Sequence, residues 1–160
     1  MTPVDSYWMQ QALCLAERAQ QLNEVPVGAI VVLDDVVIGT GYNQIISTCD
    51  PTAHAEVLAL RNAAKTLNNY RLLNASLYVT LEPCSMCAGS MVHSRIGRLV
   101  FGASEPKAGV VASRGEFFKQ DFLNHQVQTL GGVCAEQSAL MLSNFFARRR
   151  AEKKNLRRSV

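Results

Sequence analysis

The sequence has no long hydrophobic run, no export signal and no even set of cysteines, and each absence excludes a class of protein. No window reaches about 18 uninterrupted apolar residues, so we expect neither a membrane-spanning helix nor a membrane partner. The N-terminus, Met-Thr-Pro-Val-Asp-Ser, lacks the basic and then apolar layout of a secretory signal, which predicts a cytoplasmic protein. Five cysteines without such a signal do not predict a disulfide framework.

Charged residues are also sparse, at 18% of the chain, whereas hydrophobic residues make up 48%. This mix is typical of a compact globular protein rather than of a disordered segment. A length of 160 residues suits one domain with a single core. Because no internal repeat or low-complexity linker interrupts the chain, residues 1–160 are predicted to form one domain.

Positive charge is concentrated at the C-terminus. Residues 148–158, RRRAEKKNLRR, contain seven of the sixteen Lys and Arg residues and one of the thirteen Asp and Glu residues, a local charge of +6. The remainder has nine basic and twelve acidic residues and so carries −3. Such a basic appendage on a mildly acidic body is typical of segments that bind polyanions, and the alternative is a solvated helix end.

The spacing of apolar residues predicts helices that alternate with strands, which favours parallel strand pairing with helices packed on the sheet. We therefore expect an α/β fold with a mixed sheet of about five strands, while residues 104–125 show no clear pattern. The predicted helices are 5–23, 53–67, 85–94 and a basic C-terminal helix at about 134–158. The predicted strands are 27–33, 36–43, 76–81, 98–103 and, more weakly, 126–130.

The stretch TLEPCSMCAGSM, residues 80–91, places two cysteines where a predicted strand gives way to a helix. Pro83 ends the strand, so Cys84 and Cys87 are predicted in the first helical turn, where the helix dipole favours thiolates. A Cys-x-x-Cys pair alone is ambiguous. It can be a thioredoxin-type redox pair, half of a structural zinc site, or part of a catalytic site.

The histidines distinguish between these kinds of site. A closed structural site needs two further ligands, yet the chain has no second Cys-x-x-Cys and no His-x3-His. Its histidines, His54, His93 and His125, are isolated, so three ligands with an open position is the favoured count. His54 is the best third ligand, because it opens a predicted helix and Glu56 follows two residues later.

Zinc held by one imidazole and two thiolates keeps a position for water, whose pKa falls from about 15.7 to as low as about 7. Two thiolates weaken this acidification, so a nearby base helps, and Glu56 is predicted to be that base rather than a ligand. The pattern H-x-E followed by P-C-x-x-C is the signature of zinc-dependent nucleobase deaminases. Here it reads HAE at 54–56 and PCSMC at 83–87.

Over most of its length the sequence also resembles the bacterial tRNA-specific adenosine deaminases of the cytidine deaminase superfamily. The resemblance implies a three-layer α/β/α cytidine-deaminase-like fold, one zinc ion per subunit and a homodimer. It implies hydrolytic conversion of adenosine to inosine at the wobble position of an arginine tRNA anticodon. The blocks that carry it are EVPVGA (24–29), VIGTGYN (37–43), DPTAHAE (50–56), NYRL (69–72), LYVTLEPCSMCAGSMVHSRIGRLVFGA (77–103) and NFFARRR (144–150).

The resemblance also implies roles for individual residues. His54, Cys84 and Cys87 are expected to hold zinc. Glu56 is expected to carry protons while C6 of adenine is attacked, and Asn43 to hydrogen-bond the purine. Glu105 stands where the family usually has aspartate, which puts one contact to a neighbouring nucleotide in doubt. The RNA contacts implied are Glu105, Lys107, Phe145, Arg148, Arg149 and Arg150.

Three alternatives remain open at this point. The first is a zinc deaminase of a free base or nucleotide, of the guanine or cytosine type, which does not require the basic C-terminal segment. The second is a non-catalytic, zinc-stabilised RNA-binding module, for which the carboxylate of Glu56 has no use. The third is a thioredoxin-like redox role, which the lack of that fold's βαβ start before the cysteines disfavours.

Overall fold

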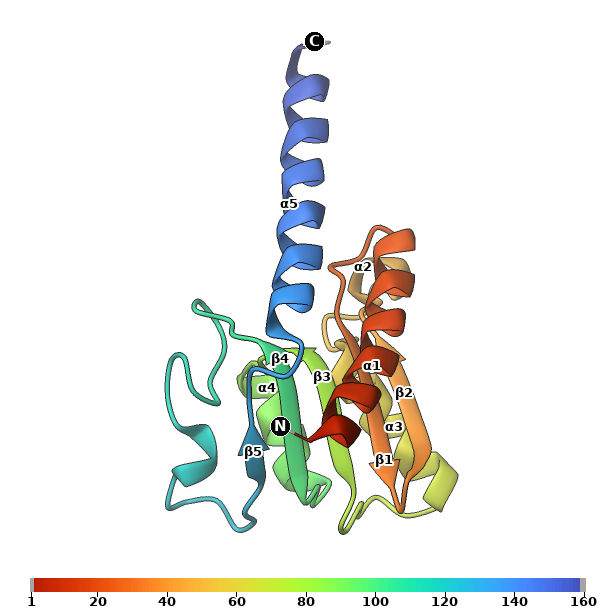
Figure 1. The fold of residues 1–160 in the computed structure, drawn as a ribbon, viewed down its shortest axis with the longest axis vertical. Helices are drawn as coiled ribbons and strands as arrows, with labels where there is room; N and C mark the ends of the chain where they lie inside the picture. The colour runs from red at the N-terminus through yellow and green to blue at the C-terminus, as the bar shows by residue number, and fades with distance from the viewer. Residues whose placement is uncertain (1, 159–160) are drawn as a thin grey trace.

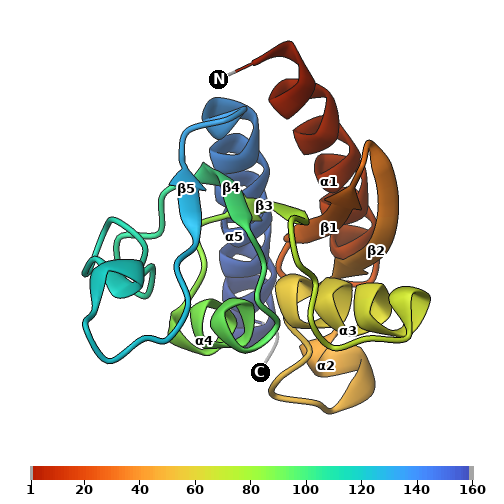
Figure 2. The same ribbon diagram turned by 90° about the horizontal axis from the view of Figure 1, so that it is seen from below.

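The computed structural model describes residues 2–158, in which helices cover both faces of a five-stranded sheet (Figure 1). Figure 2 shows α1 and α5 on one face, with α3 and α4 on the other. The predicted three-layer α/β/α architecture with a mixed sheet is therefore confirmed. The strands are β1 (Gly28–Leu33), β2 (Val36–Tyr42), β3 (Ser76–Leu81), β4 (Arg98–Ala103) and β5 (Gln128–Leu130). The α-helices are α1 (Pro3–Gln21), α2 (Ile45–Thr48), α3 (Ala55–Leu67), α4 (Ser85–His93) and α5 (Ala135–Arg158), with a 3-10 helix η1 (Phe117–Lys119).

The strand order is β2-β1-β3-β4-β5. Strand β1 runs antiparallel to both β2 and β3, whereas β3, β4 and β5 are parallel. The start of β1 and the ends of β2, β3 and β4 therefore meet at one edge of the sheet. In α/β sheets, ligands bind outside the carboxyl ends of parallel strands, so this edge is where a site is expected.

The hairpin between β1 and β2 uses Asp34 and Asp35, as the spacing of the two strands predicts. Both residues have positive φ angles, 49° and 58°. A two-residue turn of this kind has the backbone twist that matches paired strands, and aspartate tolerates the left-handed region better than most residues. The hairpin places Asn43, which follows β2, at the same edge as the start of β1.

Strands β1, β3 and β4 are buried on both faces, so alternate residues enter two separate cores. Val31, Leu77 and Leu99 pack with α3 and α4. Ile30, Tyr78 and Val100 pack with α1. Burial of both faces explains why these strands read as continuous apolar runs rather than as alternating polar and apolar residues.

Helix α3 packs very closely on β2. A Cβ atom on Gly41 would lie 2.2 Å from the carbonyl oxygen of Ala55 and 2.6 Å from the backbone nitrogen of Ala59. Only glycine leaves room for this approach. The contact fixes the first turn of α3, where His54 and Glu56 lie, against the sheet.

A buried carboxylate attaches α1 to the sheet. Asp5 is 1% exposed and forms a capping box with Thr2 at the start of α1. Across the sheet it accepts hydrogen bonds from Arg98 Nη1 at 2.7 Å and from the hydroxyl of Tyr78 at 3.2 Å. The Arg98 guanidinium holds the pKa of Asp5 well below its usual range, against the opposing effect of burial.

We expect Asp5→Asn to lower the free energy of unfolding at pH 7 by about 1–3 kcal/mol, because the charge-assisted bonds to Arg98 are lost. Folding lowers the pKa of Asp5, so its contribution is complete above the unfolded-state pKa of about 4 and is lost as the pH falls toward the folded-state value. The difference between the variant and the wild type in urea denaturation should therefore be smaller at pH 3 than at pH 7. A difference of equal size at both pH values would contradict this role.

One short helix was not predicted. Residues 44–52, between a predicted strand and a predicted helix, contain α2, whose Ser47 backbone N–H donates to the buried Glu24 carboxylate at 2.7 Å. A four-residue helix is too short to produce a periodic pattern, and its partner lies far away in the sequence. Residues 104–125 have no strand or α-helix and contain only η1, in accord with their lack of pattern.

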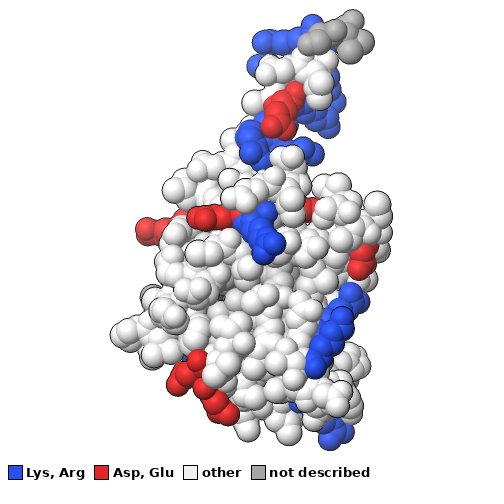
Figure 3. Space-filling view, turned by 90° about the vertical axis from the view of Figure 1, so that its right-hand side faces the viewer, with Lys and Arg blue, Asp and Glu red and all other residues white. Residues whose placement is uncertain are grey.

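The last helix, predicted at about 134–158, is α5. Its C-terminal part projects beyond the other elements in Figure 1. Lys and Arg side chains gather on this projecting part (Figure 3), where Glu152 pairs with Arg148 and Arg149. Within residues 2–158, no helix combines the length and the apolar character needed to cross a bilayer.

Candidate zinc and nucleotide site

Two helix starts bring the predicted metal ligands together. His54 is the residue that precedes α3, and Cys84 is the residue that precedes α4. Cys87 lies in the first turn of α4 and is fully buried. Both helices begin at the edge of the sheet where β2 and β3 end. Side chains that are 30 residues apart in the sequence therefore converge on one point.

The three donor atoms have the spacing of a tetrahedral zinc site. The two sulfurs are 3.7 Å apart, and Nδ1 of His54 lies 3.7 Å from Cys84 Sγ and 3.5 Å from Cys87 Sγ. For tetrahedral zinc, with about 2.3 Å to sulfur and 2.0 Å to nitrogen, the corresponding distances are about 3.8 Å and 3.5 Å. Zinc therefore fits these residues, and three protein ligands leave one position open.

The two sulfurs lie within hydrogen-bonding distance, and this interaction moves their pKa values in opposite directions. The hydrogen-bond interaction with Cys87 lowers the pKa of Cys84 to about 3, with a further contribution from His54. The same hydrogen bond, together with burial, raises the pKa of Cys87. The lowered pKa of Cys84 agrees with a thiolate at this helix start, and the presence of both thiolates at a zinc site stays a prediction.

Glu56 is buried next to the donor cluster. It lies in the first turn of α3, is 4% exposed, and lines the same pocket as His54 and Cys84. Burial raises the pKa of Glu56 to about 7, a value suited to a group that takes and returns protons near neutral pH. Within residues 2–158, the metal-donor atoms that lie within 4.8 Å of one another belong to His54, Cys84 and Cys87, and Glu56 is not among them.

The pocket beside this cluster has a volume of about 230 Å³. It is smaller than the ~300–1,000 Å³ of sites for drug-sized ligands, and so it suits one planar base. The walls come from the edge of the sheet where the three strand ends and the start of β1 meet. The lining residues are Val25, Val27, Asn43, Ile45, His54, Glu56, Leu81, Glu82, Cys84, Glu105 and Ala108.

Asn43 and Glu105, both predicted to contact the substrate, line this pocket. Asn43 is 6% exposed, and its Oδ1 accepts a hydrogen bond from the backbone N–H of Ala55 at 2.9 Å. The amide oxygen therefore stabilises the start of α3, which leaves the NH2 group as the donor for a ligand. The sequence does not show that the oxygen is occupied, because the partner at Ala55 lies twelve residues further along the chain.

The other predicted RNA contacts lie outside the pocket. Lys107 is exposed on the loop after β4. On α5, Phe145 is buried at 4% exposure, whereas the neighbouring Phe146 is 44% exposed. Arg148 lies over the Phe145 ring, 5.5 Å from its centroid, and pairs with Glu152, as does Arg149. Contacts of Phe145 and of Arg148, Arg149 and Arg150 with RNA therefore stay predictions, and Phe146 offers more of its ring to solvent.

Several pocket residues were not found from the sequence. The most important is Glu82, a buried carboxylate two residues before Cys84. Burial raises the pKa of Glu82, but hydrogen bonds from Ser113, Ala112 and Glu105 lower it by more. The net pKa is therefore lowered, which keeps Glu82 ionised. A single glutamate after a strand carries no periodic or motif signal, and its partners are 23 to 31 residues away.

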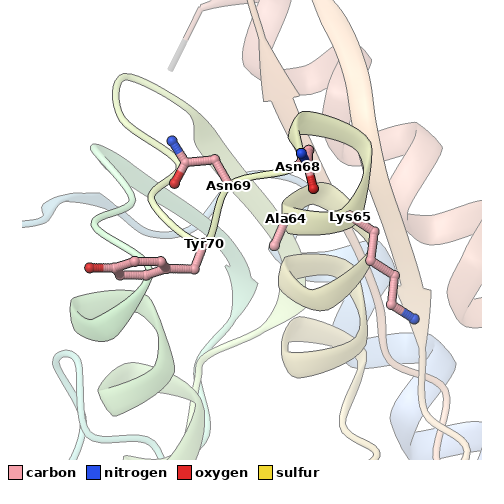
Figure 4. A pocket seen from close by; sticks show the side chains of 5 residues that line it. All are labelled: Ala64, Lys65, Asn68, Asn69 and Tyr70. Carbon is pink, nitrogen blue, oxygen red and sulfur yellow. The ribbon is translucent and has the colours of Figure 1, made fainter.

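A second hollow lies at the C-terminal end of α3, away from the cysteines (Figure 4). Its lining contains neither a metal-donor cluster nor any predicted site residue. It is lined by Ala64, Lys65, Asn68, Asn69 and Tyr70. The candidate active site is therefore the pocket at the sheet edge rather than this second hollow.

Comparison with known proteins agrees with the site. The family model described as "Cytidine and deoxycytidylate deaminase zinc-binding region" matches residues 2–103. The tRNA-specific adenosine deaminase of Haemophilus influenzae is 55% identical over 152 residues, which cover 94% of this chain and 87% of the relative. The tRNA-specific adenosine deaminase of Bacillus subtilis is 39% identical, with 98% and 97% of the two chains covered.

A solved structure gives the same result. It comes from biochemical and structural studies of A-to-I editing by tRNA:A34 deaminases at the wobble position of transfer RNA. Its TM-score is 0.83 at 43% identity, and the match covers 85% of this chain and 99% of that one. The fold and site thus define a zinc-binding deaminase of the cytidine and deoxycytidylate deaminase class. Within that class, the chain belongs to the family of tRNA-specific adenosine deaminases.

Proposed function

We propose that this protein converts adenosine to inosine at the wobble position of a tRNA anticodon, with water as the nucleophile and ammonia as the second product. One observation carries the proposal: His54, Cys84 and Cys87 have tetrahedral zinc spacing directly beside the buried carboxylate of Glu56. When bound there, zinc supplies Lewis acidity that makes water a nucleophile near neutral pH. We propose one zinc ion per subunit, because the chain has one such donor cluster within residues 2–158.

Glu56 moves the protons of the reaction. Its carboxylate takes a proton from the attacking water and delivers it to the purine ring as C6 is attacked. It then takes the remaining proton from the hydroxyl added at C6 and passes it to the departing amino group, so that the C6–N bond breaks, ammonia leaves and the C6 carbonyl of inosine forms. A group with a pKa near 7 is suited to both directions of transfer, because neither its acid nor its base form is strongly favoured.

Asn43 orients the base. Because its Oδ1 is held by Ala55, its NH2 group is fixed in direction and donates to an acceptor on the purine. The small pocket and its apolar residues Val25, Val27 and Leu81 hold the flat base and exclude water around it. A base inside a stacked loop cannot reach this depth, so the wobble nucleotide turns out of its stack to enter.

The projecting part of α5 is proposed to contact the tRNA phosphates. Its cations are exposed and gathered in one place, whereas the body of the protein is mildly acidic. Phosphate contacts of this kind give affinity and salt dependence rather than base selectivity. Selectivity for an arginine tRNA and assembly as a homodimer are further parts of this proposal, supported by the family to which the chain belongs.

Replacing Lys153 and Lys154 together by glutamine is expected to weaken tRNA binding several-fold. The slope of log Kd against log salt concentration should fall by about 1 to 2, because two phosphate contacts are removed. Filter binding at several salt concentrations measures both quantities. The matched control replaces Lys65 and Lys119, which are exposed on the body, and should change neither. An unchanged slope in the α5 variant would count against this helix as the phosphate contact.

The direct test is to incubate the purified protein with total tRNA and, separately, with free adenosine, adenine, guanine and cytidine. Inosine at the wobble position and ammonia are then measured. We expect product from tRNA alone, because a free base cannot use the contacts along α5. Product from the free compounds only would instead assign the site to small-molecule deamination, and zinc binding without product would assign it to a structural role.

A further inference from the structure

The loop of residues 105–113 forms one wall of the pocket, and it is attached to a single buried carboxylate. Glu105 and Ala108 of this loop line the pocket together with Glu56. The carboxylate belongs to Glu82, which follows β3, precedes Pro83 and Cys84, and is 3% exposed. Neither the proton transfers nor the metal cluster described above uses Glu82.

Both oxygens of Glu82 are fully engaged by the loop. Oε1 accepts from the backbone N–H groups of Ala112 at 2.8 Å and Ser113 at 2.9 Å. Oε2 accepts from the backbone N–H of Glu105 at 3.0 Å and from the hydroxyl of Ser113. A carboxylate has about four acceptor positions, and here all are taken. Glu82 therefore has no free position for a substrate donor, although it borders the pocket.

Two more contacts hold the loop against Glu82 and Pro83. The backbone N–H of Val110 donates to the carbonyl of Pro83 at 3.1 Å. Gly109 lies so close that a Cβ there would be 2.5 Å from Cδ of Glu82 and 2.6 Å from the carbonyl oxygen of Glu105. The loop is thus closed around the Glu82 carboxylate, and it has no strand or α-helix of its own to hold its shape.

We propose that Glu82 is a positioning residue for the deamination, whose carboxylate holds the loop 105–113 as the pocket wall against the bound nucleotide. The inference rests on the proposed function. Its physical basis is that Glu82 and Pro83 follow β3 and lead directly into Cys84, so the pocket wall and the cysteine pair share one support. Movement of the loop would shift Glu105 and Ala108 relative to Glu56, and a displacement of about 1 Å can lower a rate about 100-fold.

The test is Glu82→Gln, which keeps the size of the side chain but turns one oxygen into an NH2 group that faces backbone N–H donors. Amide hydrogen exchange, measured by NMR, should accelerate at least about tenfold at Glu105, Ala112 and Ser113 and not in the sheet. The single-turnover rate at saturating tRNA should fall about 10- to 100-fold. The Kd for tRNA should stay within about threefold, because α5 supplies the phosphate contacts, and zinc content should not change.

The matched control is Glu116→Gln, which removes the same charge from an exposed residue just beyond the loop and should alter none of these quantities. Ser113→Ala is the second variant, and it applies even when Glu82→Gln does not fold. It removes one of the four hydrogen bonds and should lower the single-turnover rate about two- to tenfold. A purely structural role for Glu82 predicts faster exchange throughout the sheet and a rate loss that follows global stability.

Two results would overturn the assignment of Glu82. The first is that the folded Glu82→Gln variant has the same single-turnover rate as the wild type. If that variant does not fold, the same result in Ser113→Ala would overturn the assignment. The other is unchanged amide exchange at the three loop residues. These results differ from failure of the proposed function itself, in which the wild-type protein forms no inosine in tRNA. If the wild type deaminates tRNA and the Glu82→Gln variant is fully active, the positioning role is wrong and the proposed function still stands.

Discussion

Glu56→Ala is expected to lower the rate of tRNA deamination by about 10²–10⁴-fold, which is the range that general acid–base catalysis supplies. Glu56 is the buried carboxylate that shares the pocket with His54 and Cys84, and burial has raised its pKa to about 7. Without it, the pocket lacks the carboxylate that lies beside the two cysteines and is proposed to take a proton from water and return one to the amino group. The single-turnover formation of inosine in tRNA measures this loss.

The same variant should leave the other properties of the protein intact. Glu56 is outside the metal-donor cluster, so zinc content by elemental analysis should remain stoichiometric. The Kd for tRNA should change little, because the phosphate contacts are proposed on α5. Glu56→Gln keeps the volume but not the base, and it should be as inactive as Glu56→Ala. Turnover within tenfold of the wild-type rate, with zinc present, would disprove the proton-transfer role.

The burial of Glu56 also predicts an effect on stability. Folding places this carboxylate in a site where its charged form is disfavoured, which costs free energy. Glu56→Gln relieves that cost, so its melting temperature should be equal to or above that of the wild type. If the Glu56 carboxylate stabilised the fold, Glu56→Gln would instead lower the melting temperature. Functional sites commonly show this conflict between stability and activity.

Cys87→Ala is expected to have the second large effect, the loss of zinc and with it of activity. Cys87 supplies one of three donors whose spacing matches tetrahedral zinc. Loss of a direct ligand should weaken zinc binding by more than about 100-fold, beyond the range reported for residues that only orient a ligand. Zinc titration with a competing chelator measures the affinity, and inosine formation measures activity.

The control for this experiment is Cys14→Ala, which removes an exposed thiol on α1 that is not part of the donor cluster. It should keep both zinc and activity. Because Cys87 is fully buried, its replacement also leaves a small cavity, and the melting temperature of the metal-free protein separates that effect from zinc loss. Stoichiometric zinc in active Cys87→Ala would remove this residue from the ligand set.

Much of the fold was predicted correctly because its elements have strong local signals. The continuous apolar runs of the central strands and the near-helical spacing of α1 and α3 depend on neighbouring residues alone. The fold class is confirmed, and so is the resemblance to the tRNA-specific adenosine deaminases. The miss is α2, which is too short to show a period. The loop after β4 showed no pattern, and its residues instead make hydrogen bonds to Glu82.

The site was predicted in part for the same reason. His54 and the two cysteines stand at helix starts, and those starts are marked by local patterns, so these residues could be chosen as candidate ligands from the sequence. Their zinc binding stays a proposal, which the distances between donor atoms support. The occupied oxygen of Asn43 and the burial of Phe145 rather than Phe146 could not be predicted, because each depends on a partner elsewhere in the chain.

The sequence by itself determined which donor groups exist and where they fall along the chain: an imidazole and a carboxylate at one helix start, and two sulfurs at another. These follow from residue type and spacing, which are local properties. Only the tertiary structure decided that the two helix starts meet at one sheet edge. It also decided that Glu82 holds the pocket wall. These outcomes depend on strand order and on burial, which arise when segments distant in the sequence pack together.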